Sequence, residues 1–235
     1  MSDHTSKQFD AEMEAIRSGV LSMGGLVERQ VRRAIEALGE DEDARLIDAV
    51  AVDEQEINHM QSAIDQQCTQ IIARRQPTAV DLRLIMTVTK IVNDLERIGD
   101  EAKKIAYKAV NVRGSDRLTR IRYHDVVRMA GGTQKMLRES LDAFARLDVN
   151  AAARVVEEDD DIDVAFNAVM RQLISFMMED PRTIGAALEV VFIAKSIERI
   201  GDHSKNVAES VVQAVKGKDV RHASAEQIRA EVAGE

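Results

Sequence analysis

The sequence predicts an all-α protein built from two tandem, homologous three-helix bundles with six long antiparallel helices. Three observations lead to this fold class. The chain of 235 residues is 45% hydrophobic but contains only 3% aromatic residues and two prolines, a composition that disfavours β-sheets and their turns. Apolar residues recur every three or four positions, which is the period of an amphipathic helix. Finally, the second half of the chain repeats the first.

The repeat is clearest in one short motif. Segment 95–100 (LERIGD) returns as segment 197–202 (IERIGD) at an offset of 102, and segment 34–38 matches segment 140–144 at an offset of 106. A repeat of this length that occurs only twice indicates two homologous domains and not a solenoid. We therefore expect bundles at 7–112 and 116–216, followed by a polar, frayed tail at 217–235.

Breaks in the apolar pattern divide each domain into three helices. In the first domain they fall at 39–41 (GED) and 76–78 (QPT), and in the second at 148–150 (DVN) and 180–182 (DPR), with the domain junction at 113–116 (RGSD). Proline in the first turn of a helix sacrifices no intrahelical hydrogen bond and presets φ, which explains its place in both repeats. Short side chains with a polar oxygen commonly cap the helices that follow. The expected caps are Asp116, Asp148 or Asn150, and Asp180.

Composition also excludes several classes of function. The net charge of −9 argues against binding nucleic acid through a phosphate-neutralising surface. The N-terminus lacks the basic and apolar regions of a secretory signal, and the apolar stretches are too short to span a bilayer, so any membrane association is expected to be peripheral. The single cysteine, Cys68, lies in an apolar stripe and suits a core position in a reducing, cytoplasmic compartment.

Two acidic pairs stand out in the repeated motif, namely Glu96 with Asp100 and Glu198 with Asp202. Residues four apart share a helix face with Cβ atoms about 6 Å apart, and like charges at that spacing destabilise a helix by about 0.2–0.5 kcal/mol unless something neutralises them. One such pair is ordinarily a solvated surface. Its recurrence with the same flanking residues indicates a specific site.

Each acidic pair has a counterpart on the preceding helix. In the second domain the counterpart is Asp159 with Asp163, and in the first it is Glu54 with Asn58. Asn58 removes one charge from the first set, so the second set is fully carboxylate. We expect the second set to bind a cation more strongly.

The register of the helices predicts that each pair meets its counterpart. The midpoint between the Glu54/Asn58 and Glu96/Asp100 pairs falls at Pro77, and the midpoint of the second set falls beside Pro181. Residues equally far from a turn between antiparallel helices lie at one height. In addition, a mid-helix glycine costs about 1 kcal/mol relative to alanine, so Gly99 and Gly201 indicate a need for clearance at the backbone.

Four oxygen-bearing side chains in each domain would suit a hard or borderline cation such as Mg²⁺, Mn²⁺, Fe or Zn²⁺. Oxygen ligands alone do not select one of these metals. His203 is a further candidate ligand, and neutralisation by nearby arginines and lysines is the simpler alternative. The candidate metal ligands are Glu54, Asn58, Glu96, Asp100, Asp159, Asp163, Glu198 and Asp202. The candidate neutralising residues are Arg97, Lys103, Arg199 and Lys205.

The main alternative is a di-iron carboxylate protein, an oxidase or metal store. That site needs Glu-x-x-His on each of two helices. Segment 56–59 (EINH) fits once, but its counterpart 161–164 (DIDV) lacks the histidine, and three helices per domain is one too few. The sequence also lacks a glycine-rich phosphate loop, a G-x-S-x-G elbow and a zinc-type Cys/His cluster, so we expect no enzymatic activity.

With the duplicated E-R-I-G-D motif, segment 76–83 (QPTAVDLR) and the six-helix layout, the sequence resembles the PhoU family over about residues 7–216. The resemblance assigns metal motifs to Glu96/Asp100, Glu198/Asp202 and Asp159/Asp163, with Asn58 departing from the pattern. It implies a negative regulator of phosphate uptake and of the phosphate-starvation response. It also implies two partners, the PstB-like ATPase of the phosphate ABC transporter and a PhoR-like sensor histidine kinase, and a homodimer.

Overall fold

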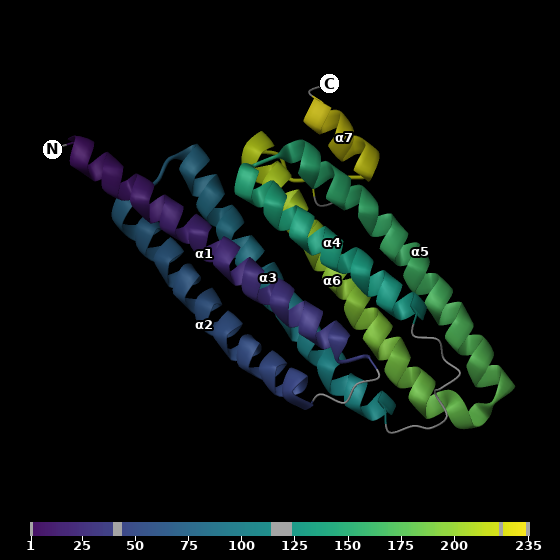
Figure 1. The fold of residues 1–235 in the computed structure, drawn as a ribbon. Coiled ribbons are helices and arrows are strands. Elements are labelled where there is room, and N and C mark those ends of the chain that lie inside the picture. Colours follow the sequence, from purple (N-terminus) through teal and green to yellow (C-terminus); the bar gives the residue numbers. More distant parts are fainter. Residues whose placement is uncertain (1, 40–43, 114–123, 221–222, 234–235) are drawn as a thin grey trace.

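The computed structural model describes residues 2–39, 44–113, 124–220 and 223–233, and within these ranges it is helical with no strand (Figure 1). This confirms the predicted all-α class. The helices are α1 (Ser2–Glu36), α2 (Ala44–Arg75), α3 (Ala79–Arg113), α4 (His124–Arg146), α5 (Val149–Glu179), the 3-10 helix η2 (Pro181–Thr183), α6 (Ile184–Lys216) and α7 (Ala225–Ala233).

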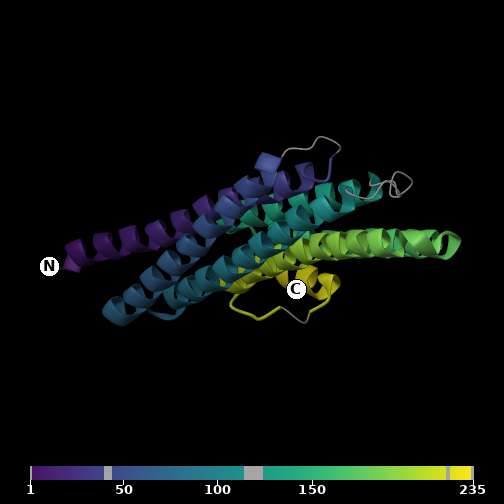
Figure 2. The same ribbon diagram turned by 90° about the horizontal axis from the view of Figure 1, so that it is seen from below.

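The long helices form two bundles, α1–α2–α3 and α4–α5–α6, in which each helix packs against the other two. Figure 2 shows the long helices running side by side. Their buried stripes follow the apolar period of the sequence and merge into one core. Cys68 lies in this core as predicted, and burial raises the pKa of its thiol to about 11. Burial of such stripes, roughly 25 cal/mol per Å² of apolar surface, stabilises the bundles.

The turn of the second repeat follows the local chemistry expected from the sequence, with Pro181 in the first turn of η2, whereas the same expectation is wrong for Pro77, because α3 begins only at Ala79. Helix α2 ends directly before Gln76, whose φ of 47° reverses the chain ahead of Pro77. The Asp148 carboxylate accepts hydrogen bonds from the backbone N–H groups of Asn150 and Ala151, so Asp148 caps α5 and Asn150 does not. Asp180 caps η2 in the same way. The expected cap at position 116 lies outside the described residues.

The two bundles pack together chiefly through α3 against α6, with α1 against α4 beside them. At one end of the α3–α6 contact Lys90 Nζ donates to Gln213 Oε1 at 2.7 Å, and at the other end Lys108 Nζ lies 2.9 Å from Glu189 Oε2. These pairings make the two helices antiparallel. The centre of the contact falls at the two E-R-I-G-D motifs, so the duplicated segment lies where the bundles cross.

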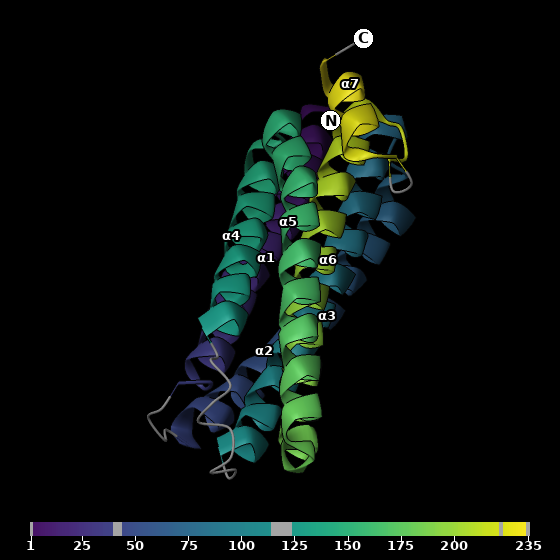
Figure 3. The same cartoon turned by 90° about the vertical axis from the view of Figure 1, so that its right-hand side faces the viewer.

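The expectation of a frayed tail after residue 216 is wrong for Ala225–Ala233, which forms α7 against α5 (Figure 3). Ile228 is fully buried there, and Lys216 Nζ donates to the Val232 carbonyl at 3.1 Å. The missed signal is a capping box, in which Ser224 and Gln227 each accept a hydrogen bond from the other's backbone N–H. In the part of the chain that the structure describes, no helix has the length and apolar composition to cross a membrane.

Candidate metal centres

The second acidic cluster joins Asp159 and Asp163 of α5 to Glu198 and Asp202 of α6. Asp159 and Glu198 are buried. Burial, reinforced by the negative charges of Glu198 and Asp159, raises the pKa of Asp202 to about 6. Asp163 lies at the exposed edge of the cluster, where partial desolvation and the same two carboxylates still raise its pKa. The four side chains are therefore close enough to repel one another across the α5–α6 contact, as the register about Pro181 predicts.

Two lysines lie against this cluster and reduce its charge. Lys205 Nζ donates to Asp159 Oδ2 at 2.7 Å, and Lys195 Nζ donates to Glu198 Oε1 at 2.5 Å. The other oxygen of Glu198, Oε2, is buried and has no hydrogen-bond partner. A buried acceptor without a partner costs about 1–3 kcal/mol, so the cluster retains unused capacity to accept a donor or a cation.

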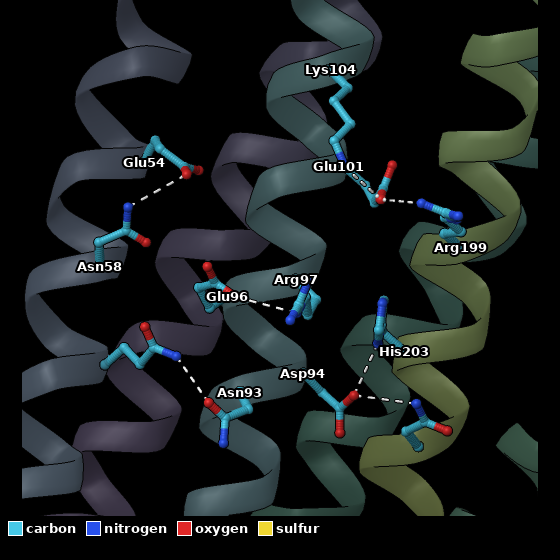
Figure 4. Close-up of polar contacts among 12 residues, drawn as sticks. Glu54, Asn58, Asn93, Asp94, Glu96, Arg97, Glu101, Lys104, Arg199 and His203 are labelled. Carbon is cyan, nitrogen blue, oxygen red and sulfur yellow. Dashed lines mark hydrogen bonds and ion pairs between the residues drawn. The ribbon is translucent and has the colours of Figure 1, made fainter.

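The first acidic cluster contains Glu54 and Asn58 of α2, which face each other in Figure 4, and Asp100 of α3, whose charge acts on Glu54. Glu54 is buried and accepts from Gln30 Nε2 at 3.1 Å and from Asn58 Nδ2 at 3.5 Å, while Lys103 Nζ lies 3.8 Å from its carboxylate. Burial raises the pKa of Glu54, and Asp100 adds to the increase. Asn58 therefore acts here as a hydrogen-bond donor to the Glu54 carboxylate. In the second repeat the equivalent pair is Asp163 and Asp159, two carboxylates that repel each other when both are ionised.

Glu96 lies at the edge of the first cluster. Burial raises the pKa of Glu96, and the negative charge of Asp100 raises it further. The Glu96 carboxylate lies 3.7 Å from the Arg97 guanidinium. Among the described residues, no three Asp, Glu, His or Cys side chains are already arranged as a set that could hold a metal ion. The predicted ligands of each domain are thus gathered in one cluster. In this arrangement their oxygens are contacted by lysines and, in the first cluster, by Gln30.

The two clusters differ in their numbers of carboxylates and lysines. The second cluster has four carboxylates with two lysines, whereas the first has three carboxylates, from Glu54, Glu96 and Asp100, with one lysine, Lys103. At the repeat position of Lys195 the first domain has Asn93, whose side-chain oxygen accepts from Gln61 at 2.9 Å. The extra carboxylate of the second repeat is therefore accompanied by an extra lysine. With Arg97 beside Glu96 counted, the net charge of the fully ionised groups is about −1 in the first cluster and about −2 in the second.

We expected Gly99 and Gly201 to be needed because a side chain at either position would collide with a neighbouring helix, and this is so for Gly99 only. A Cβ atom on Gly99 would lie 2.9 Å from Gln30 Oε1 and 3.3 Å from Ile57 Cδ1, so glycine permits α1 and α2 to approach α3. A Cβ atom on Gly201 would find its nearest neighbours at 3.5 Å, an ordinary van der Waals distance. The clearance argument is therefore wrong for Gly201, because the first bundle has a buried glutamine at this point and the second has none in contact.

Both clusters border one polar cleft of about 610 Å³ between α3 and α6. Asp100 and Asp202 line it, together with basic residues from both helices. Glu101 also lines the cleft, and its carboxylate accepts hydrogen bonds from Lys104 at 2.9 Å and from Arg199 at 3.2 Å. Burial opposes ionisation of Glu101, but the hydrogen bonds from Lys104, Ser196 and Arg199 outweigh it and lower its pKa.

Two residues considered from the sequence have other partners in this cleft. Arg199 binds Glu101 and not the acidic cluster, and His203 Nδ1 lies 2.9 Å from Asp94 Oδ1 across the α3–α6 contact. The sequence analysis missed Lys195, although a lysine three residues before Glu198 on a helix is a recognisable pair. It also missed Gln30, which comes from α1 and carries no local signal.

Comparison with known proteins supports this architecture. The PhoU domain model matches residues 20–109 and 126–211, one copy in each bundle. A Pseudomonas aeruginosa protein described as a phosphate-specific transport system accessory protein PhoU homolog is 45% identical and covers 99% of this chain and 95% of its own. The Escherichia coli phosphate-specific transport system accessory protein PhoU is 42% identical, covering 100% and 96%.

Solved structures agree with the sequence relatives. The crystal structure of PhoU from Pseudomonas aeruginosa superposes with a TM-score of 0.84 at 45% identity and covers 89% of this chain and 100% of that one. The phosphate transport system regulatory protein PhoU from Streptococcus pneumoniae gives a TM-score of 0.82 at 26% identity, covering 90% and 99%. The two matched domains and the full-length relatives place this chain in the PhoU family.

Proposed function

We propose that this protein is a negative regulator of phosphate uptake and of the phosphate-starvation response. It acts in the cytoplasm as an adaptor between the PstB-like ATPase of the phosphate ABC transporter and a PhoR-like sensor histidine kinase. The observation that carries the proposal is the full-length similarity to accessory proteins of phosphate-specific transport, at 42–45% identity. The adaptor step itself is an expectation from the family resemblance.

The architecture suits a binding protein better than an enzyme. The polar cleft between α3 and α6 holds paired charges, such as Glu101 with Lys104 and Arg199, so these groups are already engaged in ion pairs. A nucleophile activated by an adjacent base, the usual mark of covalent catalysis, does not occur among the residues that line it. We propose a non-enzymatic role that depends on protein contacts, with a homodimer as the working assembly.

We further propose that the acidic clusters bind metal ions. The support is the partnerless buried oxygen of Glu198 and the raised pKa of Asp202, which both reflect excess negative charge. Oxygen donors of this kind fit Mg²⁺, Mn²⁺, Fe or Zn²⁺. A bound cation would neutralise the carboxylates and release Lys195 and Lys205 from them. In the second cluster the ligands would be Asp159, Asp163, Glu198 and Asp202. In the first cluster the ligands would be Glu54, Glu96, Asp100 and the side-chain amide oxygen of Asn58.

The regulatory role is tested by deleting the gene and measuring alkaline phosphatase activity in phosphate-rich medium. We expect high activity in the deletion strain and repression when the wild-type gene is restored on a plasmid. A plasmid with a frameshift early in the gene is the matched control and leaves activity high. Repression that persists in the deletion strain would refute the regulatory role.

A further inference from the structure

An apolar strip lies exposed on the outer surface of α6 and the adjoining part of α3. Ile184, Leu188 and Phe192 follow one another at intervals of four on α6 and are 42%, 43% and 51% exposed, and Tyr107 on α3 is 50% exposed. At 1.5 Å per residue, the three α6 side chains extend over about 12 Å, or two helical turns. Exposed apolar rows of this kind mark interaction sites when polar groups surround them.

The two helices are joined at this strip by Lys108. Its ammonium nitrogen lies 4.4 Å from the centroid of the Phe192 ring and 2.9 Å from Glu189 Oε2. The cation–π contact holds Phe192 in place without covering it, since half of the side chain remains exposed. The aromatic ring is therefore presented in a fixed position, as in an anchor residue of an interface.

The border of the strip is basic, which is unusual for a chain with a net charge of −9. Lys104, Lys195 and Arg199 are each about half-exposed, whereas the carboxylates that they bind, Glu101 and Glu198, are buried. Segment 102–110 of α3 (AKKIAYKAV) has three lysines and no acidic residue. An acidic ligand would be attracted here and repelled by the protein's overall charge elsewhere.

The duplicated position in the first bundle provides a comparison. There, Leu82, Met86 and Lys90 of α3 replace Ile184, Leu188 and Phe192, and Leu82 and Met86 are also exposed. The neighbouring helix has Asn206, Glu209 and Ser210 where the strip has Lys104, Tyr107 and Lys108. The first bundle thus keeps part of the apolar row, with Lys90 and Arg97 as its basic residues, but it has neither the aromatic rings nor counterparts of Lys104, Lys108 and Lys195.

We propose that the strip formed by Tyr107, Ile184, Leu188 and Phe192, with its border of Lys104, Lys108, Lys195 and Arg199, docks an amphipathic helix with an acidic polar face from a protein partner. The apolar side of such a helix would pack on Leu188 and Phe192. Its carboxylates would reach the basic border. This combination is the usual chemistry by which an amphipathic helix is recognised in a groove.

The test uses two synthetic amphipathic peptides with the same leucine stripe, one with glutamates on its polar face and one with lysines. Binding to the full chain is measured by fluorescence anisotropy. We expect the glutamate peptide to bind at least tenfold more tightly than the lysine peptide, and more weakly at higher salt. Equal binding of both peptides, or binding of neither, would overturn the proposal, and this comparison needs no variant.

Two double variants locate the binding surface. L188A/F192A should raise the Kd for the glutamate peptide at least tenfold, whereas the matched control L82A/M86A should change this Kd less than twofold. An equal effect of both variants would overturn the proposal. Binding of the protein to anionic lipid vesicles in place of the peptide would also overturn it, because the ligand would then be a membrane. So would a loss of self-association in L188A/F192A, because the strip would then be a contact between two copies of this chain. Peptide binding is measured without phosphate signalling, so its failure is distinguishable from failure of the proposed function.

Discussion

Replacing Asp202 with asparagine should stabilise the metal-free protein although it removes a candidate ligand. In the folded protein, burial and the neighbouring Glu198 and Asp159 carboxylates raise the pKa of Asp202 from 3.8 to about 6. A difference of about two pH units corresponds to nearly 3 kcal/mol at 1.36 kcal/mol per unit. Because the side chain is only half-buried, solvent screening reduces this to about 1–2 kcal/mol. Asparagine keeps the shape and removes the charge.

The direction of the pH dependence follows from the raised pKa. The folded protein binds the Asp202 proton more tightly than the unfolded chain does, so the folded state loses stability as pH rises from about 4 to about 6 and stays at the lower level above that. D202N does not experience this loss. Its advantage over wild type should therefore be largest at pH 8 and should disappear near pH 4.

Thermal unfolding in the presence of a chelator measures this effect. For a chain of this size, about 1–2 kcal/mol corresponds to a rise in Tm of roughly 3–6 °C at pH 8. D161N, which removes an exposed carboxylate from α5, is the matched control and should stay within about 0.5 kcal/mol of wild type. A lower Tm for D202N at pH 8, or an increase that persists unchanged at pH 4, would refute the reasoning.

Four further substitutions test the packing and one helix cap, each by the free energy of unfolding in urea. G201A should stabilise by up to about 1 kcal/mol through helix propensity, whereas G99A should destabilise by about 1 kcal/mol because its Cβ meets Gln30; equal effects would contradict the difference in clearance. D148A should cost about 1 kcal/mol through loss of the α5 cap, and no change would show that the cap is dispensable. I228A should cost about 2–5 kcal/mol, since Ile228 is fully buried between α7 and the second bundle; a neutral result would mean that α7 does not pack stably.

The repeated motif and the two prolines were enough to predict how the helices pair. The register about Pro77 and Pro181 depends only on chain length between positions, so it identified Glu54 and Asp159 as facing residues without knowledge of the packing. The composition likewise predicted the helical class, because few aromatics and prolines leave few other options. These inferences use local and periodic information that the sequence contains directly.

Features that depend on how the helices pack in three dimensions, within a bundle or between bundles, could not be read in the same way. Gln30 reaches Glu54 from α1, and His203 reaches Asp94 across the α3–α6 contact, so each partner is set by packing angles. The error over the C-terminal segment has a different cause. Ser224 and Gln227 form a recognisable capping box, but the polar composition around it concealed a helix with one buried apolar residue, Ile228.

The central claim is that the acidic clusters are cation sites whose charge is balanced by lysines when no cation is bound. Anomalous diffraction from crystals of protein loaded with Mn²⁺, Fe or Zn²⁺, which scatter anomalously, tests it most directly. The account predicts an anomalous peak bonded to Asp159, Glu198 and Asp202, with Lys195 and Lys205 displaced, and a weaker peak or none at the Asn58 cluster. Absence of any peak at the second cluster, with both lysines still bound to their carboxylates, would contradict it.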